Sequence, residues 1–319
     1  MMLYRTILSL GLLLGLCTSA IAQSYPVKPI TLLVPFPPGT AVDVAARIVA
    51  TKATEFLGQP VLPTNRDGAS GNIAIETAGN AAPDGYTLVL GSTSFSINIF
   101  TIKGSFPLAK FTPVAMVGMQ PYTLMVPTSV PAKNIKELVA LFKSKQGQFN
   151  AATGGPTGTG FFLLDSFKKA GGFNIEMVAY KGTTLAVADL LESRTHMLFA
   201  PLVTALPHMK SGKIMLQGIT GSKRSPLIPD VPTFIDSGFP MLDVPTWFAV
   251  MGPAGVSRPV VTRINQAVVK ALTSKDVIDQ LTRVGIEPTP GTPEEADAFL
   301  KADVANWAKM VKQAGVKAQ

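Results

Sequence analysis

The sequence has 319 residues, 47% of them hydrophobic and only 15% charged, which favours a chain with a large folded core and excludes a disordered one. This length indicates about two domains. The formal net charge of +8 favours anionic ligands, but lysine and arginine are scattered without a basic run or interleaved aromatic residues, so nucleic acid is not an expected partner.

Residues 1–22 have the features of a cleavable export signal and do not enter the fold argument. A short basic start is followed by an apolar run at 7–16, too short for a stable membrane span, and by Ala-Ile-Ala at 20–22. We therefore predict cleavage before Gln23 and localisation in the periplasm. The alternative is a lipoprotein anchored through Cys17, although a leucine stands where lipid attachment would want a small residue. Cys17 is the only cysteine, so the mature chain would have neither a disulfide nor a cysteine metal site.

The next stretch, residues 30–56, is the one around which the chain is organised. Residues 30–34 are an apolar, branched run typical of a buried parallel strand, and the proline- and glycine-rich loop at 36–40 ends it. Thr40 is expected to N-cap a helix, with Asp43 three residues on and Gly58 as the stop. A glycine loop leading into a helix N-terminus offers free N–H donors, which indicates an anion site. The alternative is a plain strand-to-helix turn.

The same organisation continues to residue 94. We expect strands at 60–63 and 86–90, a helix at 72–82, and exits from the strands into polar loops at 65–71 and 91–94. Alternating strands and helices predict a parallel sheet. Ligands of such sheets bind outside the carboxyl ends of the strands, where all three polar loops lie.

A second alternating unit follows a strand expected at 122–126. Asn134 is expected to cap a helix that runs to about residue 145. Further strands are predicted at 149–152, 175–179 and 196–199, and helices at 161–170 and 185–192. The exits at 153–160, 180–184 and 200–203 are again rich in small and polar residues, so two α/β lobes should face each other across a ligand cleft.

Residues 247–251 are expected to form a strand, and three helices, beginning near Ser257, Lys275 and Thr292, close the chain. We expect these helices to pack on the first domain. The predicted division is a first domain of residues 23–123 and 248–319 and a second domain of residues 124–247. The hinge is expected near residues 122–126 and 245–250.

The residue types needed for catalysis are not assembled in the sequence. His196 and His208 share no metal-ligand spacing, and His196 is expected to be a hydrogen-bonding residue at a strand end. The sequence has no G-x-S-x-G, Walker or G-x-G-x-x-G motif. We therefore expect neither an enzyme nor a cofactor or metal.

Four motifs resemble one known family. They are Y-P-x-K-P-I-x-x-x-V-P-F-x-P-G at 25–39, G-Q-P-V at 58–61, A-P-D-G-Y-T-L at 82–88 and D-V-P-T-F at 230–234. Nearly the whole mature chain is similar to the substrate-binding receptors of tripartite tricarboxylate transporters, also called Bug receptors. The resemblance implies a two-lobed α/β fold of the periplasmic-binding-protein kind (Venus flytrap, type II-like), each lobe a mostly parallel sheet flanked by helices. It also implies a periplasmic protein, expected to be a monomer, that binds a small carboxylate and delivers it to membrane subunits of a transporter.

The resemblance also implies where the ligand lies. In the family, the loops after the first and second strands hold one carboxylate with the help of ordered waters, and the second domain supplies the opposite residues. Together with the polar strand exits, this gives the predicted ligand-binding residues Phe36, Pro38, Gly39, Thr40, Ala69, Ser70, Ser92, Thr93, Ser94, Thr153, Thr157, Gly158, Thr159, Lys181, Thr183 and Ala200.

Several residues depart from the family pattern. Gly39-Thr40 stands where paired glycines are usual, Asp67 where a proline is usual, Lys181 where an arginine is usual, and Ala200 where an aspartate is common. An amino-acid ligand would need an acceptor for its ammonium group, and burying an unmatched cation costs several kcal/mol. We therefore predict a carboxylate without an amino group. The alternative is that Ala200 only packs and does not meet the ligand.

Three other classes of protein compete with a transport receptor. An orphan periplasmic ligand sensor would have the same fold. A ligand-sensing domain of a transcription regulator would need a DNA-binding segment where this chain has the expected export signal. A secreted enzyme would need a nucleophile, base or metal constellation.

Overall fold

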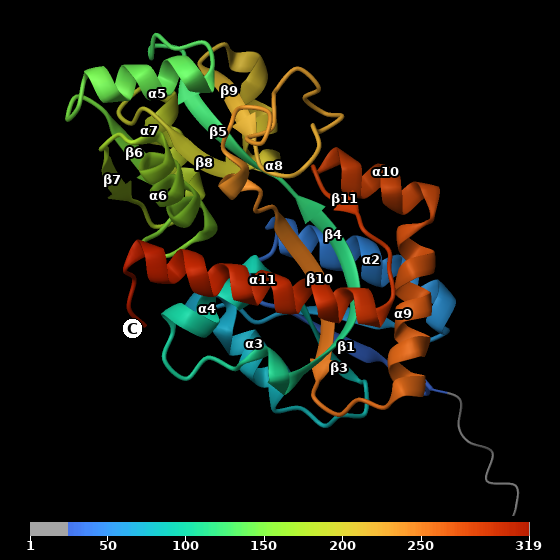
Figure 1. Cartoon of the computed structure of the whole chain (residues 1–319). Helices are drawn as coiled ribbons and strands as arrows, with labels where there is room; N and C mark the ends of the chain where they lie inside the picture. Colours follow the sequence, from blue (N-terminus) through green and yellow to red (C-terminus); the bar gives the residue numbers. More distant parts are fainter. Residues whose placement is uncertain (1–24, 319) are drawn as a thin grey trace, which may run out of the picture.

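A computed structural model describes residues 25–318, which fold into two lobes, each built on its own β-sheet (Figure 1). The expected signal segment, Gln23 and Cys17 lie outside the described residues. The predicted two-lobed α/β fold is confirmed. Within residues 25–318, no helix has the length and apolar character needed to cross a bilayer.

The first lobe has a six-stranded sheet in the order β11-β4-β10-β3-β1-β2. Its strands are β1 (Ile30–Val34), β2 (Val61–Asn65), β3 (Thr87–Ser92), β4 (Phe111–Gln120), β10 (Thr246–Pro253) and β11 (Glu287–Pro288). Its helices are α2 (Ala41–Leu57), α3 (Asn72–Gly79), α4 (Thr93–Thr101), α9 (Arg258–Leu272), α10 (Lys275–Arg283) and α11 (Pro293–Ala314).

The second lobe has a five-stranded sheet in the order β7-β6-β8-β5-β9. Its strands are β5 (Tyr122–Pro127), β6 (Asn150–Thr153), β7 (Glu176–Ala179), β8 (Leu198–Pro201) and β9 (Ile214–Ile219). Its helices are α5 (Ile135–Ser144), α6 (Thr159–Gly171), α7 (Thr183–Leu191) and α8 (Leu202–Ala205). The strands β4, β9 and β11 and the helices α4 and α8 were not predicted from the sequence.

Strand pairing differs from the expected mostly parallel arrangement, because both sheets are mixed. β1 is parallel to β2 and β3, and β6 is parallel to β7 and β8. β10 is antiparallel to β3 and β4, β11 is antiparallel to β4, and β5 is antiparallel to β8 and β9. The physical reason is that β10 returns from the second lobe and enters the first sheet against the direction of β3.

Helix ends follow the local chemistry of the sequence. Thr40 caps α2 and accepts a hydrogen bond from the Asp43 amide, and Gly58 ends the helix in the left-handed conformation. Asn134 caps α5 through the Glu137 amide. Thr292 forms a full capping box with its partner three residues on at the start of α11. These expected caps are confirmed.

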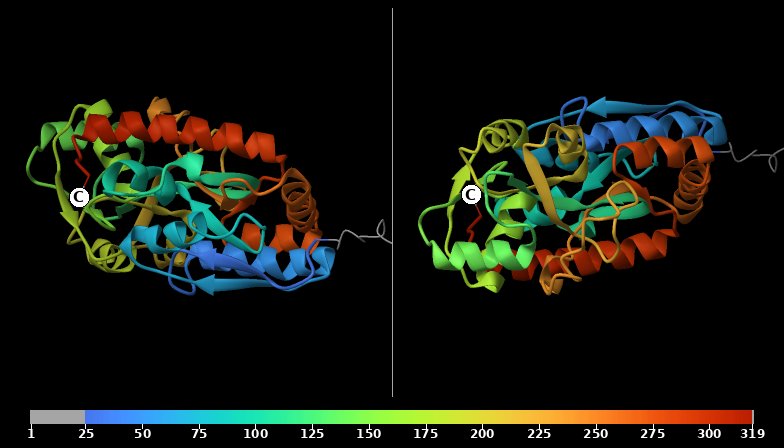
Figure 2. Two further views of the ribbon diagram at one scale, coloured as in Figure 1. Left: turned by 90° about the horizontal axis from the view of Figure 1, so that it is seen from below. Right: turned by 90° about the horizontal axis from the view of Figure 1, so that it is seen from above.

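The three C-terminal helices only partly follow the expectation that they pack on the first domain. α9 and α10 contact α2, as expected. α11 contacts α4 and β4 of the first lobe but also α6 of the second, and its C-terminal end reaches the second lobe (Figure 2). There the rings of Phe162 and Trp307 lie 5.6 Å apart, and Lys169 Nζ donates to the carbonyl oxygen of Gln313 at 2.8 Å. α11 therefore bridges the lobes.

The chain passes between the two sheets at two places, which we call the crossing segments. β4 leads into β5 through Pro121, and the chain returns through Pro245 into β10. The domain bounds at residues 123/124 and 247/248 stay a prediction beside these strand ends.

Candidate functional site

The predicted site residues lie mainly on the loops and helix starts that follow β1, β2 and β3 in the first lobe and β6 and β7 in the second. We call these segments the exit loops. α4 and α6, which begin directly after two of them, contact each other across the lobes. The fold therefore brings the two sets of exit loops together, as predicted.

In the loop after β1, an internal carboxylate occupies the expected anion position. The Gly39 N–H donates to Asp43 Oδ2 at 2.9 Å, and Asp43 also accepts from Arg47 Nε at 3.0 Å and from Asn65 Nδ2 at 2.8 Å. Burial acts to raise the pKa of Asp43, but these hydrogen bonds outweigh burial and lower the pKa overall. The Gly39 amide is therefore already paired within the protein.

The rest of this loop is more open. Pro38 is exposed and Phe36 is partly buried. The Thr40 hydroxyl donates to the Pro37 carbonyl oxygen at 2.9 Å, while its amide lies 3.4 Å from the same oxygen. The first-turn amides of α2 that follow Thr40 have no partner within the helix by its geometry. Because the Asp43 amide donates to the Thr40 hydroxyl, the amides of Ala41 and Val42, not that of Gly39, are the donors that α2 offers to a ligand.

The loop after β2 holds four consecutive residues at positive φ. The φ angles are 118° at Gly68, 47° at Ala69, 55° at Ser70 and 91° at Gly71. The left-handed region is unfavourable for alanine and serine, and such strain gathers at functional sites. Ala69 and Ser70, both predicted site residues, are therefore held in a conformation that the surrounding structure imposes.

The loops after β1 and β2 and helix α4 support one another. A Cβ on Gly71 would lie 3.0 Å from Pro35 Cβ, so the two loops approach closely. Asn98 of α4 donates from Nδ2 to the Ser70 carbonyl oxygen at 3.0 Å. These contacts hold the strained turn against its neighbours.

After β3, helix α4 starts at once where the sequence analysis expected a loop. Ser92 and Ser94 hydrogen-bond to each other through their hydroxyls at 2.9 Å. The Thr93 hydroxyl accepts the Trp247 amide at 3.0 Å and is buried. Thr93 thus secures the start of β10, and its hydroxyl is engaged inside the protein.

In the second lobe, the exit loops of β6 and β7 pack together. The Gly182 amide donates to the Gly154 carbonyl oxygen at 3.2 Å, and a Cβ on Gly154 would lie 2.7 Å from Thr183 Oγ1. Thr153, at the end of β6, is 1% exposed, and its hydroxyl has no hydrogen-bond partner within the described residues. A buried hydroxyl without a partner indicates a missing ligand or water.

Two residues of the crossing segments join the site and were not predicted. Burial raises the pKa of Tyr122 at the start of β5, and the hydroxyls of Thr159 and Thr246 beside it act to lower that pKa. The Thr246 hydroxyl is buried and lies beside the Tyr122 side chain. Tyr122, Thr159 and Thr246 come from β5, α6 and β10, so this polar cluster depends on both crossings.

The remaining predicted residues divide into two groups. Thr157 and Gly158 precede α6, and Lys181 is exposed beside the partly buried Thr183. Ala200 instead is 0% exposed and packs in the core of the second lobe, which corrects its placement in the ligand site. β8 alternates its side chains between two cores, and the backbone oxygen of Ala200 is taken by the hydroxyl of Thr123 at 3.2 Å.

The chemistry available at the exit loops is hydrogen bonding, with two exposed cations, Lys181 after β7 and Arg66 after β2. Among residues 25–318, His, Cys, Asp and Glu side chains nowhere gather in a group of three or more that could hold a metal ion. His196 hydrogen-bonds through Nδ1 with Asn150 Oδ1 at 2.8 Å, which confirms its expected role at the strand end. Hydroxyls, free amides and Lys181 suit a small anion.

Comparison with known proteins gives a consistent family. A family model described as "Tripartite tricarboxylate transporter family receptor" matches residues 45–316. Protein BugT of Bordetella pertussis is 33% identical over 307 residues, which cover 95% of this chain and 94% of BugT.

Two solved structures are similar over nearly the whole chain. "R. palustris Rpa4515 with adipate" has a TM-score of 0.81 at 30% identity and covers 92% of this chain and 100% of its own. "MatC (Rpa3494) from Rhodopseudomonas palustris with bound malate" has a TM-score of 0.77 at 29% identity, with 90% of this chain and 100% of its own covered.

Proposed function

Because the chain belongs to the tripartite tricarboxylate transporter receptor family, we propose that it is a periplasmic solute receptor that captures a small carboxylate between its lobes. It delivers this solute to the membrane subunits of a transporter and acts by binding, without catalysis, as a monomer. Adipate and malate in two similar structures support a carboxylate of this size. The predicted signal segment supports export to the periplasm.

The observation that carries the proposal is the pair of buried hydroxyls of Thr153, at the end of β6, and Thr246, at the start of β10. The Thr153 hydroxyl has no partner within the described residues, and the Thr246 hydroxyl lies beside Tyr122. In the proposed complex these hydroxyls hydrogen-bond to one end of the solute, together with Tyr122 and Thr159. The other end lies against residues 69–71 and the first turn of α2, whose amides donate to a carboxylate. Two polar ends on opposite lobes match a dicarboxylate.

The charges around the exit loops support a ligand without an amino group. The loops at 154–158 and 180–182 contain no acid, and Lys181 is the charged residue there. In the first lobe, the Asp43 carboxylate is already satisfied by Arg47, whereas Asp67, exposed on the loop after β2, forms no ion pair within residues 25–318. An ammonium group held against the second-lobe loops would therefore lack an anionic partner there, at a cost of several kcal/mol. Ala200, buried in the core, no longer contributes to this argument.

A ligand screen tests the ligand class. Purified protein beginning at residue 23 is titrated by calorimetry with adipate, malate, succinate, citrate and terephthalate, and with glutamate and aspartate. At least one plain carboxylate should bind more tightly than either amino acid. Tighter binding of glutamate or aspartate than of every plain carboxylate would reject the proposed ligand class.

Valine substitutions test the site itself. Thr153→Val removes an unpartnered buried hydroxyl, so the ligand-free protein should be unchanged or up to about 1 kcal/mol more stable. Thr246→Val also removes a neighbour of the Tyr122 hydroxyl and should cost up to about 1 kcal/mol of stability. Affinity for the best carboxylate should fall roughly threefold to tenfold, the value of a lost hydrogen bond. Thr195→Val is the matched control, because Thr195 also has a buried, unpartnered hydroxyl but lies before β8, away from the exit loops. Equal affinity in all three variants would refute the assignment.

A further inference from the structure

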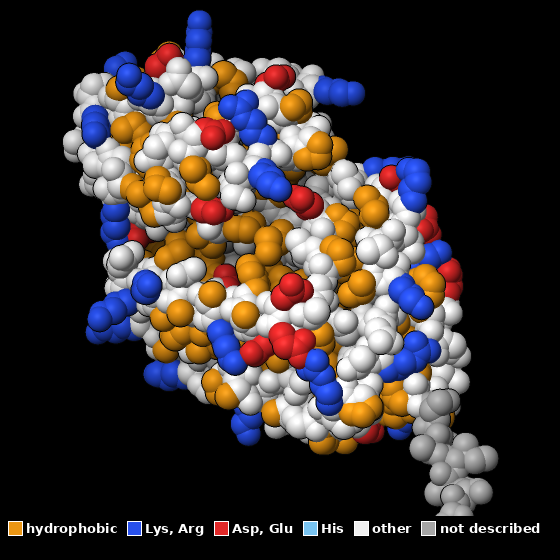
Figure 3. All heavy atoms as spheres, turned by 45° about the vertical axis from the view of Figure 1, so that its right-hand side comes forward, with side chains coloured by type: hydrophobic (Ala, Val, Ile, Leu, Met, Phe, Trp, Pro, Cys, Tyr) orange, Lys and Arg blue, Asp and Glu red, His pale blue; other side chains and the backbone are white. Residues whose placement is uncertain are grey.

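A cavity of about 500 Å³ lies between the lobes, on the other side of the crossing segments from the exit loops. The first lobe contributes the edge strand β11 and the end of α10, and the second lobe contributes residues 220–227 after the edge strand β9. Pro121 and Pro245 of the crossing segments also line it. On the face seen in Figure 3, the surface between the lobes is hollowed, with hydrophobic side chains inside and charged ones at its edge. We call this cavity the rear pocket.

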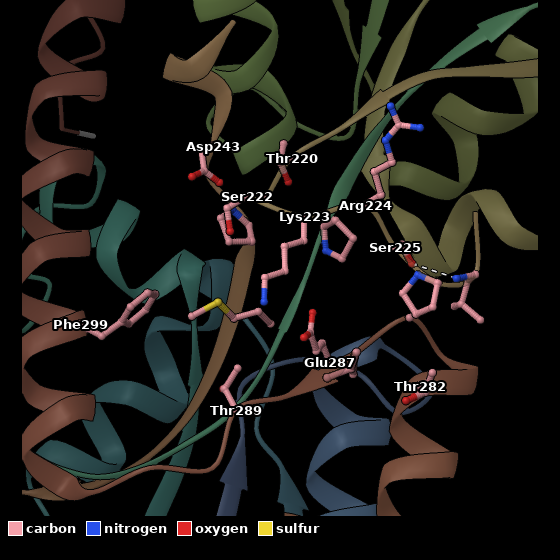
Figure 4. A pocket seen from close by; sticks show the side chains of 18 residues that line it. Thr220, Ser222, Lys223, Arg224, Ser225, Asp243, Thr282, Glu287, Thr289 and Phe299 are labelled. Carbon is pink, nitrogen blue, oxygen red and sulfur yellow. Dashed lines mark hydrogen bonds between the residues drawn. The ribbon is translucent and has the colours of Figure 1, made fainter. Parts of the chain in front are cut away.

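Two opposite charges from different lobes face each other in the rear pocket. Lys223 extends from the loop after β9, and its ammonium group points toward the Glu287 carboxylate on β11 (Figure 4). Their distance exceeds that of an ion pair, and within the described residues neither side chain forms one with any other group.

The other charged groups of the rear pocket, Arg224 and Asp243, belong to the second lobe, like Lys223. Arg224 pairs with Asp236 at 3.3 Å within the second lobe. Asp243 is exposed and forms no ion pair within the described residues; desolvation raises the pKa of its carboxyl, which the Gly221 amide acts to lower. Lys223 and Glu287 are therefore the charges left to act between the lobes.

The position of the rear pocket couples it to the proposed site. The exit loops follow β1, β2 and β3 on one side of β10, whereas β4 and β11 lie on its other side. Rotation of the lobes about the crossing segments that opens the space between the exit loops must narrow the space on the opposite side. Such a rotation would bring Lys223 and Glu287 together.

We infer that Lys223 and Glu287 form an ion pair between the lobes when the ligand site is open, and that this pair lowers the affinity for the ligand by stabilising the open state. The two residues determine affinity without touching the ligand, because ligand binding must break their contact. The inference rests on the proposed capture of a solute between the lobes. A ligand shifts such an equilibrium only through its different affinity for the two states.

Pulsed electron spin resonance between two spin labels tests this directly. The only cysteine is Cys17, in the expected signal segment, so protein beginning at residue 23 accepts two introduced cysteines without competition. Asp230→Cys in the second lobe and Gln280→Cys in α10 are exposed and place the labels on the two sides of the rear pocket. The distance is measured without ligand in four backgrounds: wild type, Lys223→Glu, Glu287→Lys and the double charge swap.

Each single charge reversal should lengthen the label distance of the ligand-free protein, and the double swap should restore it. Adipate affinity should rise about twofold to fivefold in the single variants, as expected for a pair between solvent-accessible groups. Lys103→Glu, an exposed lysine of the first lobe without an ion pair, gives the same change of net charge as Lys223→Glu and should leave the distance unchanged.

Unchanged distances in both single variants would overturn the inference. The inference would also be overturned if the change of label distance in the double swap equalled the sum of the changes in the single variants. The changes would then not come from the contact between Lys223 and Glu287. A wild-type protein that fails to bind any carboxylate would count against the proposed function instead, and the ligand-free distances would still decide the role of Lys223 and Glu287.

Discussion

At the scale of single residues, Asp43 supplies a hydrogen-bond acceptor for the Gly39 amide just before its own helix. Its carboxylate, 2% exposed, accepts hydrogen bonds from the Gly39 amide, Arg47 and Asn65. The acceptor for the Gly39 amide, which was expected to be an external anion, is supplied by the helix itself. The contribution of Asp43 is therefore to stability, by fixing the loop against β2.

Replacing Asp43 by alanine should destabilise the protein by about 1–3 kcal/mol, because a buried amide and two side chains lose their acceptor. The pKa of Asp43 lies below its ordinary value of 3.8. The stability it contributes is therefore fully present above pH 3.8 and is lost as the pH falls through the lower pKa of the folded state.

Denaturant unfolding at pH 7 and at successively lower pH checks this. Asp279→Ala, which removes an exposed ion pair with Lys275, is the control and should have little effect. An Asp43→Ala penalty of the same size at pH 7 and well below the folded pKa would contradict the electrostatic account.

At the scale of elements, the strained turn after β2 links fold and site. Ala69 and Ser70 hold left-handed angles, and Asn98 fixes the carbonyl oxygen of Ser70 at 3.0 Å. Residues with such unfavourable backbone angles cluster at functional sites, including those that bind ligands.

Ser70→Gly should relieve the strain and stabilise the ligand-free protein by about 0.5–1 kcal/mol, since glycine adopts the left-handed region freely. Affinity for the best carboxylate should fall, because the amides of the turn become less well ordered. The control is Ser193→Gly, where φ is also positive, at 54°, but the residue follows α7, away from the exit loops. Thermal unfolding and calorimetry decide, and an unchanged affinity in Ser70→Gly would argue against a ligand role for this turn.

Helix α11 is the second element that serves both lobes. Trp307 is 0% exposed, packs edge-on against Phe162 of α6, and belongs to a cluster that includes Ile97 of α4. The end of the chain therefore adds an apolar contact between lobes that the crossing segments alone would not provide.

Trp307→Ala should cost about 3–5 kcal/mol of stability, as for large aromatic residues in cores, whereas Trp307→Phe should cost much less. The measurement is denaturant unfolding, monitored with one signal from the whole protein and one from the second lobe. Lys309→Ala, on the same helix, is the surface control. If the alanine variant unfolded at the wild-type denaturant concentration, the bridging contact would not be a stabilising one.

At the scale of the whole molecule, two lobes joined by two crossing segments imply movement about Pro121 and Pro245. The exit loops lie on one side of this axis and the rear pocket on the other. We therefore expect one rotation of the lobes to change both the space for the ligand and the width of the rear pocket.

A saturating carboxylate should reduce the radius of gyration in small-angle scattering, because the lobes close on the ligand. Glutamate, which the proposed site rejects, is the negative control at the same concentration. An identical radius with and without the best ligand would speak against closure while leaving binding itself untouched.

The sequence by itself determined the local features and the kind of fold. The caps at Thr40, Asn134 and Thr292 were predictable because capping depends on residues three positions apart. The alternation of strands and helices predicted the loops that follow β1, β2, β6 and β7, where most candidate residues lie. The four family motifs indicated the receptor family without any structure.

Only the tertiary structure decided features that depend on distant parts of the chain. β10 enters the first sheet antiparallel, which brings Thr246 beside Tyr122 and Thr159. Ala200 faces the core because strand direction, not residue type, sets which face a side chain meets. Lys223 faces Glu287 only through the arrangement of the two lobes. The physical reason is common to all three cases, since short-range sequence chemistry specifies turns and caps, whereas contacts between lobes arise from the packing of whole elements.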